Sequence, residues 1–348
     1  MVTMHDVAKR ASVSIATVSF VLSGAKPISA ATRERVETAM RELGYRRNPV
    51  GVALARGRTN IIALLYPALQ RPVSGTVMDF FTSAAARAQE RGLNLVLWPI
   101  SNDANEAAAL ARTGLVDGVL LMEVQMDDER VDALLPGTTP FALIGRTRDP
   151  AGLTYVDVDF ETSMSEAVAA LADLGHSQIA FITGNWGADH LEGHGAAERS
   201  RACFVAEMSL RGVENPLILP CPENSWDGRR LGRTLAEQHP EVTALVLMNE
   251  HAAPGLVMGL RDAGVSVPSD MSIISIGSSA HMAGMADPPL SYMRTPAVEL
   301  GRLGVDAIIE RIENAGAEPP AVLLACEMQP GDSLAPPRVR APGPATAT

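Results

Sequence analysis

The first 45 residues carry apolar side chains at helical spacing and show no alternating, strand-like pattern. A short helix is predicted over residues 6–11. Ser14 is placed to cap a second helix over residues 15–22, because a serine oxygen accepts bonds from the free amides of a first turn. A third helix ends at Gly44. Three short helices joined by tight turns predict an all-α helix-turn-helix head.

From residue 61 the pattern changes to short apolar runs that alternate with amphipathic stretches. This alternation predicts an α/β architecture in which helices cover both faces of parallel sheets. The segment is long for one such sheet, so we expect two lobes with a ligand cleft at the carboxyl ends of their strands. Strands are expected at 61–66, 93–98, 119–122, 141–144, 179–183, 244–247 and 273–276, and helices at 79–91, 162–174, 197–211, 229–238, 252–263 and 296–314.

Composition separates the chain into four parts. Residues 1–46 form the predicted helix-turn-helix domain, and residues 60–335 form the predicted two-lobed domain. Residues 47–59 between them are basic and contain Pro49 and glycines, which is typical of a linker that is helical only when held. The Pro- and Ala-rich residues 336–348 are expected to form a disordered tail.

Charge is distributed unevenly along the chain, whose net charge is −11. Residues 1–60 contain ten Lys and Arg against four Asp and Glu, a net charge of +6. Residues 61–348 contain 19 Lys and Arg against 36 Asp and Glu, a net charge of −17. A basic head on an acidic body is expected when only the head meets phosphate, although a solvated basic surface would give the same pattern.

Other features of the sequence bear on the compartment. No apolar stretch is long enough to span a membrane, and the first ten residues are too polar for a secretory signal. The three cysteines, Cys203, Cys221 and Cys326, lie far apart and form neither a disulfide framework nor a zinc pattern. We therefore expect a cytoplasmic, nucleoid-associated protein with no membrane partner.

Short motifs spread along the chain carry a resemblance to a known family. They are Asp6-Val7-Ala8-Lys9, Ala11-Ser12-Val13-Ser14, Ala16-Thr17-Val18-Ser19, Thr32-Arg33-Glu34-Arg35-Val36, Glu42-Leu43-Gly44-Tyr45, Gly57-Arg58-Thr59, Val116-Asp117-Gly118, Leu174-Gly175-His176, Asn249-Glu250, Val267-Pro268-Ser269-Asp270 and Pro289-Leu290. In this order they closely resemble the lactose/galactose repressor (LacI/GalR) family over nearly the whole chain.

The resemblance implies a fold similar to periplasmic sugar-binding proteins, with a DNA-reading head attached. It also implies a transcriptional regulator, most often a repressor, that binds a pseudo-palindromic operator as a homodimer or higher oligomer. Family effectors are usually sugars or nucleobases bound in the cleft between the lobes. No cofactor is implied.

The second helix of the head is where the resemblance and the geometry of helix-turn-helix modules place base contacts. Phe20 stands where the family often has Arg; its ring suits a thymine methyl, and the alternative is packing against the third helix. Leu54 matches a hinge-helix leucine that wedges into the minor groove, and the alternative is an ordinary core leucine. The predicted DNA-contacting residues are Met4, Ser14, Ile15, Ala16, Thr17, Ser19, Phe20, Ser23, Thr32, Asn48 and Leu54.

Asn249 and Glu250 follow a predicted strand and match the family's Asn-Asp pair, whose polar groups bond ligand hydroxyls. Asp159 matches an acidic family position after a strand, but it is equally placed to cap a helix. Trp226 is a candidate to stack on a sugar face, with an exposed loop position as the alternative.

Two other family signatures are altered in this chain. The segment that carries a sugar-binding aspartate in the family reads Ser275-Ile276-Gly277-Ser278 here. The family's arginine position falls on Ser200, with Arg199 and Arg201 on either side as candidates. The sugar-binding acceptor is lost, and two arginines are present. An anionic or less hydroxylated ligand is therefore an open alternative. The predicted ligand-binding residues are Asp159, Arg199, Arg201, Trp226, Asn249 and Glu250.

An enzyme has little support in the sequence. His190 and His194 have the spacing of two metal ligands on a helix, but neighbouring glycines indicate a loop, and no His-Glu-x-x-His pattern is completed. Neither a serine nucleophile motif nor a phosphate-binding loop is present. The remaining alternatives are a small-molecule carrier and an enzyme with a fused regulatory head. A carrier of the periplasmic type would need a signal peptide and no basic head.

Overall fold

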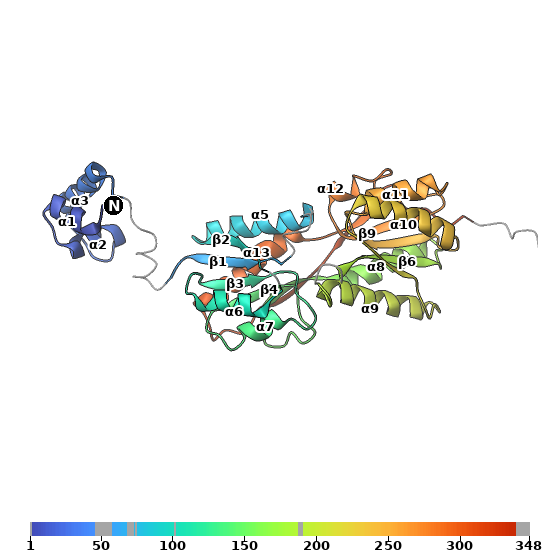
Figure 1. Cartoon of the computed structure of the whole chain (residues 1–348), viewed down its shortest axis with the longest axis horizontal. Helices are drawn as coiled ribbons and strands as arrows, with labels where there is room; N and C mark the ends of the chain where they lie inside the picture. Colours follow the sequence, from blue (N-terminus) through green and yellow to red (C-terminus); the bar gives the residue numbers. More distant parts are fainter. Residues whose placement is uncertain are drawn as a thin grey trace, which may run out of the picture. The chain divides into compact units, whose positions relative to one another are not determined.

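The chain forms two compact units, residues 1–59 and residues 60–348. Figure 1 shows the first unit as a group of three short helices and the second as an α/β structure with two lobes. Among the described residues, no helix is long and apolar enough to cross a membrane. The computed structural model describes residues 2–45, 58–67, 73, 75–100, 102–186 and 191–338.

The head contains three helices, and each begins next to a side chain that caps it. The hydroxyl of Thr3 accepts a bond from Asp6 N (3.3 Å), and the Asp6 carboxylate accepts one from Thr3 N (2.9 Å). This reciprocal cap starts the first helix at Met4, earlier than the predicted start at residue 6. The helices are α1 (Met4–Ala11), α2 (Ile15–Ser23) and α3 (Ala30–Leu43). The side chains that fill their core are Val7, Ala8, Ala11, Val18, Val21, Val36 and Ala39.

Strands and helices alternate through the body, as the apolar pattern predicts. The N-lobe is built from residues 60–159 and 296–325, and the C-lobe from residues 160–295 and 326–338. The N-lobe elements are β1 (Ile61–Leu65), α5 (Gly75–Glu90), β2 (Asn94–Trp98), α6 (Ala104–Arg112), β3 (Gly118–Leu121), α7 (Glu129–Leu134), β4 (Phe141–Ile144), β5 (Tyr155–Asp159), α13 (Ala297–Glu313) and β11 (Ala321–Ala325). The C-lobe elements are α8 (Phe160–Asp173), β6 (Ile179–Gly184), α9 (Gly195–Leu210), β7 (Ile218–Cys221), α10 (Ser225–Gln238), β8 (Ala244–Met248), α11 (Ala253–Asp262), β9 (Ser272–Ser278), α12 (Ala280–Ala283), β10 (Ser291–Arg294) and β12 (Glu327–Gln329).

The two lobes share one sheet design. The N-lobe strand order is β11-β5-β4-β3-β1-β2, and the C-lobe order is β12-β10-β9-β8-β6-β7. Neighbouring strands are parallel, except that β12 runs antiparallel to β10. The chain passes between the lobes after β5, before α13 and between β11 and β12, as Figure 1 shows. These crossings bring the carboxyl ends of both sheets toward one another.

Alternate residues of the central strands pack against different helices. Ile62 and Leu64 of β1 belong to a core with α5 and α13, whereas Ala63 and Leu65 belong to a core with α6 and α7. Successive strand side chains point to opposite faces of a sheet, so both faces of the N-lobe sheet are buried. The C-lobe sheet is covered by α8 and α9 on one face and by α10 and α11 on the other.

The helix pair α10 and α11 in the C-lobe packs backbone to backbone. Glycines lie along both helices at the contact, and a Cβ atom at any of them would overlap a backbone carbonyl oxygen of the facing segment. At Gly255, for example, that oxygen belongs to Ser225. Glycine is therefore required for this close approach. The glycines are Gly228, Gly232, Gly255 and Gly259.

The helix pair α5 and α13 in the N-lobe is held together differently. A Cβ atom at Gly301 would overlap the Ser83 hydroxyl, so the helices approach closely at that point. Further along, Arg87 pairs with Asp306 at 2.9 Å. Arg302 likewise pairs with Glu90 at 3.0 Å. The C-lobe pair also has ion pairs, from Arg229 and Arg233 of α10 to Asp262 of α11 (2.7 and 2.5 Å), so the two pairs differ in how many glycines bring backbone into contact.

The end of the body is fixed by a buried histidine. His176 Nε2 lies 2.9 Å from Ala335 O and 3.1 Å from Ser272 Oγ, and burial lowers the pKa of this imidazole. Arg338 then pairs with Asp270 at 2.6 Å. Residues 336–338, expected to begin a disordered tail, thus still contact the C-lobe. Residues 339–348 lie outside the described part of the chain.

Candidate functional site

The second helix of the head buries one face and exposes the other. Val18 and Val21 are fully or nearly fully buried in the core of the head. Ile15 leaves 46% of its surface exposed, and Ala16 and Ser19 are exposed beside it. Apolar side chains at the exposed N-terminal turn do not stabilise the head, because their surface stays in water. This is the part of a recognition helix that meets base edges in helix-turn-helix modules.

Phe20 lies at the edge of this exposed face. Its ring is half-buried, and Lys26 Nζ lies 4.9 Å from the ring centroid, which is within the range of a cation–π contact. The cation keeps the ring next to the turn that follows α2. Phe20 therefore remains available at the surface and is not one of the buried residues that form the core of the head.

Several polar residues predicted to contact DNA also bond within the head, at helix caps or next to them. Ser14 Oγ accepts a bond from Thr17 N at 3.1 Å and shares another with Thr17 Oγ1. The Ser29 hydroxyl, which caps α3, donates a bond to Thr32 Oγ1 (2.9 Å) and accepts one from Thr32 N (3.3 Å). Ser23 Oγ accepts from Ala25 N, and Met4 is 39% exposed at the start of α1. Asn48 and Leu54 lie outside the described residues.

A cavity of about 200 Å³ lies inside the body, between the two lobes. On this measure one water needs roughly 15 Å³, so the cavity is large enough for a small organic molecule. Its walls come from the carboxyl ends of β1, β3, β4, β5, β6, β7, β8, β9 and β10, which is where open α/β sheets bind ligands. Apolar walls are Tyr66, Val77, Phe80, Met122, Val124, Ile144, Val158, Phe160, Ala196, Met248 and Ile276; polar groups come from Thr76, Glu123, Asp157, Trp186, His194, Arg199, Glu223, Asn249, Glu250, His251 and Thr295.

An ion cluster forms one wall of the cavity and joins the lobes. Arg199 of α9 donates to Asp157 Oδ2 of β5 at 2.6 Å and to Arg146 O at 2.9 Å. Arg146 pairs with the same Asp157 oxygen at 3.1 Å and also with Glu161. Burial raises the pKa of Asp157 to about 6, although the two guanidinium groups oppose the shift. Arg199 is thus committed to protein partners through both of its terminal nitrogens.

A second wall contains a stacked Trp186 and His194, with ring centroids 4.3 Å apart. His194 Nε2 lies 3.1 Å from Glu123 Oε2, and backbone bonds join residues 124–126 of the N-lobe to residues 193–195 of the C-lobe. Glu123 adopts φ +51°, and the fully buried Arg130 holds its carbonyl at 3.0 Å. An uncommon backbone conformation at a cavity residue, supported by a buried cation, marks this wall as a functional candidate.

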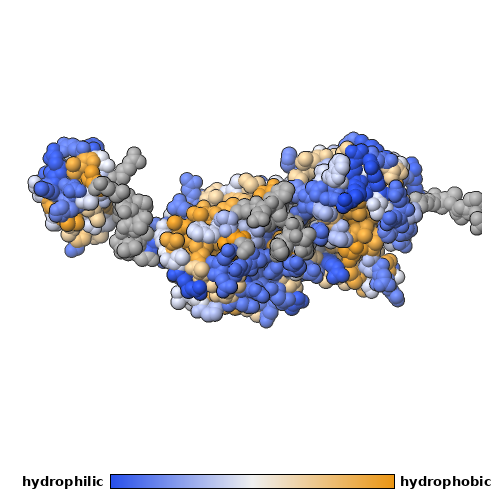
Figure 2. All heavy atoms as spheres, in the orientation of Figure 1, coloured by the Kyte–Doolittle hydropathy of each residue, from blue (hydrophilic) through white to orange (hydrophobic). Residues whose placement is uncertain are grey.

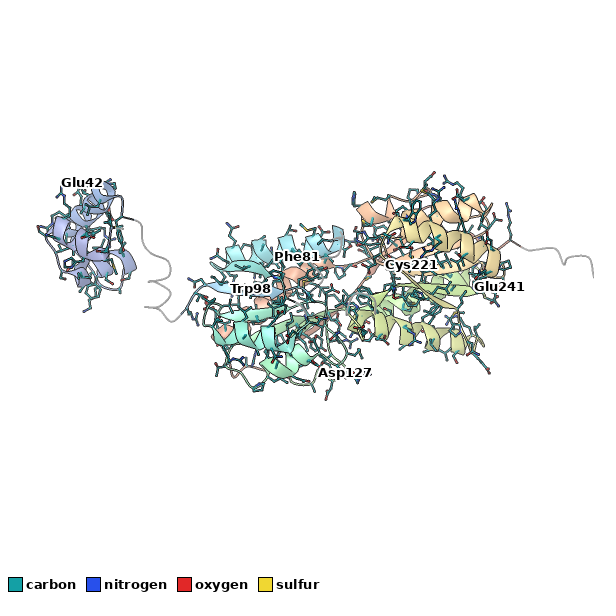
Figure 3. The ribbon with its side chains drawn as sticks, viewed as in Figure 1. Glu42, Phe81, Trp98, Asp127, Cys221 and Glu241 are labelled. Atoms are coloured by element: carbon teal, nitrogen blue, oxygen red, sulfur yellow. The ribbon has the colours of Figure 1, made fainter. Side chains whose placement is uncertain are left out.

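Asn249 and Glu250 follow β8 and face the cavity from the C-lobe. Asn249 Nδ2 donates to Cys221 O at 2.8 Å, and its Oδ1 accepts from Ala252 N at 3.1 Å. Figure 3 labels Cys221, at the end of β7. Glu250 Oε2 accepts bonds from Ser278 Oγ (3.1 Å) and from Thr76 Oγ1 of the N-lobe (3.3 Å).

Some residues at the cavity carry buried polar atoms without a hydrogen-bond partner among the described residues, and His251 Nε2 and Thr295 Oγ1 are two such atoms. A buried donor or acceptor without a partner is unfavourable by about 1–3 kcal/mol.

Comparison with known proteins explains this combination of head and body. Residues 3–48 match the family model for bacterial regulatory proteins of the lacI family, and residues 168–334 match a periplasmic binding protein-like domain. Over 309 residues the chain is 30% identical to the HTH-type transcriptional regulator DegA of Bacillus subtilis (strain 168), covering 86% of this chain and 88% of DegA. The chain belongs to the LacI family.

Other relatives agree with this assignment. Catabolite control protein A of Staphylococcus xylosus is 27% identical over 331 residues, which cover 93% of this chain and 96% of that protein. The lac repressor dimer bound to operator and the anti-inducer ONPF superimposes with a TM-score of 0.83 at 22% identity, over 96% of this chain and 99% of that one. A complex of the transcriptional regulator CelR with cellobiose gives 0.71 at 25% identity, over 96% and 100%. The predicted fold and the predicted role as a DNA-binding transcriptional regulator are confirmed.

In this LacI-family chain the structure separates the predicted ligand-binding residues into two groups. Arg199, Asn249 and Glu250 line the cavity. Asp159 instead caps α8, where its carboxylate accepts bonds from Thr162 N (2.9 Å) and Thr162 Oγ1 (2.8 Å). It is thus the helix cap that the sequence offered as the alternative to a ligand contact.

Arg201 and Trp226 also lie outside the cavity lining. Arg201 is exposed on α9, because a helix turns the neighbours of the inward-facing Arg199 to other sides. Trp226 is 78% exposed in the first turn of α10. It therefore has the exposed position that the sequence analysis gave as the alternative to stacking on a sugar. Both residues were predicted to bind the ligand, and the structure places neither of them at the cavity.

Several cavity residues were missed by the sequence prediction, chiefly Glu123, Asp157, Trp186, Glu223 and His251. Trp186 and Glu223 each lie just past the end of a strand, a position that could have flagged them. His194 is buried against Glu123 and Trp186, and His190 lies outside the described residues. Within the described residues, no three His, Cys, Asp or Glu side chains gather as a metal site.

Proposed function

We propose that this LacI-family regulator is a homodimeric repressor that binds a pseudo-palindromic operator and is controlled by a small molecule in the cavity between its lobes. The observation that carries the proposal is the pairing of a basic helix-turn-helix head with a body whose two sheets enclose a cavity of apolar walls and several polar groups. Two linked heads on two half-sites turn a weak single contact into a usable affinity.

Operator binding is tested by selection from random DNA with the full-length protein. We expect a symmetric site, bound with an affinity that falls steeply with salt, because the head displaces condensed counterions from phosphate. A protein consisting of residues 60–348 should lose this binding. Selection that returns no common sequence, or a headless protein that binds equally well, would contradict the proposal.

We assign base reading to the exposed, mostly apolar face of α2, with Ile15 and Ala16 at its centre and Phe20 at its edge. These side chains offer no hydrogen bonds, so they favour the thymine methyl over the bare polar edge of a G·C pair. Ser14, Thr17, Ser19, Ser23, Thr32 and Met4 surround this face as proposed phosphate or groove contacts. Phe20→Arg should shift the selected site toward guanine at one position in each half-site, a discrimination of about 1–3 kcal/mol. An unchanged site for the folded variant would refute base reading by Phe20.

Asn48 and Leu54 belong to the proposed hinge, and their role rests on the family resemblance alone. A leucine wedged between base steps unstacks them and bends the duplex. Leu54→Ala should weaken binding to the selected operator by about a few kcal/mol and leave binding to random DNA nearly unchanged. Equal losses on both DNAs would show that Leu54 is only structural.

A dimer surface on the N-lobe is supported by exposed apolar side chains. Met78 of α5 is 46% exposed, and Leu97 is 37% exposed on β2, the edge strand of its sheet. Figure 2 shows hydrophobic residues gathered over this part of the N-lobe. Met78→Glu should shift sedimentation of the full-length protein toward the monomer, whereas the equally exposed Leu115→Glu should not. A monomeric wild type at micromolar concentration would end the proposal.

We propose an uncharged sugar or related metabolite as the effector. Relatives include a regulator solved with cellobiose and a ribose operon repressor from Haemophilus influenzae. An anionic ligand has less support, because both terminal nitrogens of Arg199 already bond protein oxygens and Arg201 is exposed. A thermal-shift panel of sugars and their phosphates tests this, since a ligand that binds only the folded state raises its melting temperature. Stabilisation by the phosphates alone would refute it.

A further inference from the structure

The first turn of α5 reaches across the cavity to the other lobe. α5 belongs to the N-lobe, where it packs along α13, yet the hydroxyl of Thr76 donates to Glu250 Oε2 of the C-lobe at 3.3 Å. Next to it, a Cβ atom at Gly75 would lie 3.7 Å from Ser279 Oγ, which is ordinary contact distance. The beginning of this helix therefore depends on both lobes.

Glu250 is held in the position that makes this contact. Asn249, the residue before it, is fixed by its bonds to Cys221 O and Ala252 N. The Glu250 carboxylate also accepts a bond from Ser278 Oγ of its own lobe at 3.1 Å. Glu250 and Thr76 both line the cavity, so the bond between the lobes lies at the surface that an effector would touch.

The chemistry of Glu250 limits what can compete with Thr76. An ionised carboxylate only accepts hydrogen bonds, so a competitor must carry donors such as sugar hydroxyls or an ammonium group. A phosphate or carboxylate on the ligand would be repelled at this point. Bonds from a ligand donor to the carboxylate are as favourable as the Thr76 bond that they would replace.

We propose that Glu250 is a positioning residue that holds the first turn of α5 across the cavity, and that a donor-bearing effector displaces Thr76 from it. This rests on the proposed function, because it assumes that the effector binds in this cavity. α5 carries Met78, which is 46% exposed on the proposed dimer surface. Release of its first turn would thus change the surface through which two protomers meet.

Amide hydrogen exchange in the full-length protein tests the contact without any ligand. Thr76→Val keeps the shape of the side chain and removes its hydroxyl. The amides of residues 79–81 bond the carbonyls of the first turn, so their exchange should then become roughly tenfold faster, because about one hydrogen bond to a carboxylate is lost. Thr82→Val is the matched control: the Thr82 hydroxyl bonds only Met78 O and Asp79 O within the same helix.

Outcomes of the exchange measurement separate the explanations. Faster exchange in Thr76→Val and in Glu250→Gln, with Thr82→Val like wild type, supports the proposal. Equal acceleration in Thr82→Val would mean that any lost hydroxyl loosens α5 and would overturn it. Unchanged exchange in both Thr76→Val and Glu250→Gln would overturn it as well.

Operator and probe measurements test the link to regulation. On the selected operator, Thr76→Val should change affinity by about fivefold or more, the lower range of allosteric coupling, and Thr82→Val should not. Cellobiose and D-ribose are the probes, and one that raises the melting temperature should also speed exchange at residues 79–81. A probe that binds without this change would overturn the displacement of Thr76. If no DNA is selected, the proposed function fails, while the exchange results still decide whether Glu250 holds α5.

Discussion

The N-lobe and the C-lobe have the same strand order but different helix packing. In the C-lobe, α10 and α11 meet through four glycines whose missing side chains are replaced by facing backbone. In the N-lobe, α5 and α13 meet at Gly301 and are bridged by Arg87–Asp306 and Arg302–Glu90. Arg229 and Arg233 also pair with Asp262 between α10 and α11, so ion pairs occur in both lobes, and the contrast is between four close backbone contacts and one. The difference indicates a rigid C-lobe pair and an adjustable N-lobe pair, which suits the helix that contacts Glu250.

The largest effect should come from a methyl group at the rigid contact. Gly255→Ala places a Cβ on the carbonyl oxygen of Ser225, and backbone cannot rotate away, so we expect a loss of about 3 kcal/mol in the free energy of unfolding. Urea unfolding of the full-length protein measures it. Gly316→Ala is the control, because a Cβ there meets nothing within 4 Å. Equal stability of the two variants would remove the contrast between the lobes.

The next effect is a pH dependence of stability that comes from Asp157 in the ion cluster between the lobes. The pKa of Asp157 is about 6 in the folded protein against 3.8 for an unperturbed aspartate, so the folded state binds the proton more tightly. Its contribution to stability is full below about pH 4 and is lost as pH rises through about 6, about 3 kcal/mol in all. Asp157→Asn should abolish this part of the pH dependence.

Unfolding curves for wild type and Asp157→Asn at several pH values between 4 and 7 measure the difference. The stability of the wild type relative to the variant should rise as pH falls through this window. The opposite slope would show that Arg199 and Arg146 outweigh burial and keep Asp157 ionised.

A smaller loss is expected at the adjustable pair. Gly301→Ala brings a Cβ onto the Ser83 hydroxyl, which can rotate, and near Phe80 O at 2.7 Å. We expect a loss of about 1–2 kcal/mol, part of which Ser83→Ala should restore in the double variant. Additive losses in the double variant would show that Phe80 O, rather than Ser83, limits the approach.

The smallest effect is predicted for the ion pairs themselves. Arg87→Met removes a partly exposed side chain from Asp306 and Glu90, and such pairs contribute little in water. The melting temperature should change less than in Gly301→Ala, and the difference should shrink further in high salt because exposed charges are screened. A larger loss than in Gly301→Ala would show that the N-lobe pair depends on charge rather than on close packing.

The sequence predicts a strand well when its own residues show a strand pattern, and poorly when its role depends on residues far away in the chain. β1, β3, β4 and β8 are uninterrupted apolar runs, so they were predicted closely. β5 reads Tyr155-Val-Asp-Val-Asp and was missed, because a buried aspartate within a strand looks polar until its cation is known. β7 contains Pro220, and β12 is only three residues long, so neither shows a strand pattern.

The same distinction applies to the cavity. Asn249 and Glu250 were predicted because they directly follow a strand, and that position is visible in the sequence. Asp157 and Arg199 are 42 residues apart, and each is the other's ion-pair partner at the cavity. No local sequence pattern encodes this contact between the lobes. Trp226 was favoured as the aromatic plate, whereas burial places Trp186 at the cavity instead.

The crossings between the lobes also bear on the order in which the protein can fold during synthesis. All three helices of the head lie within the first 43 residues, so the head is able to fold as soon as it leaves the ribosome. The N-lobe lacks α13 and β11, and the C-lobe lacks β12, until the last tenth or so of the described chain has been made. A nascent chain thus carries a finished DNA-binding head well before it has a cavity, and translation stalled late would yield heads that bind DNA without any response to an effector.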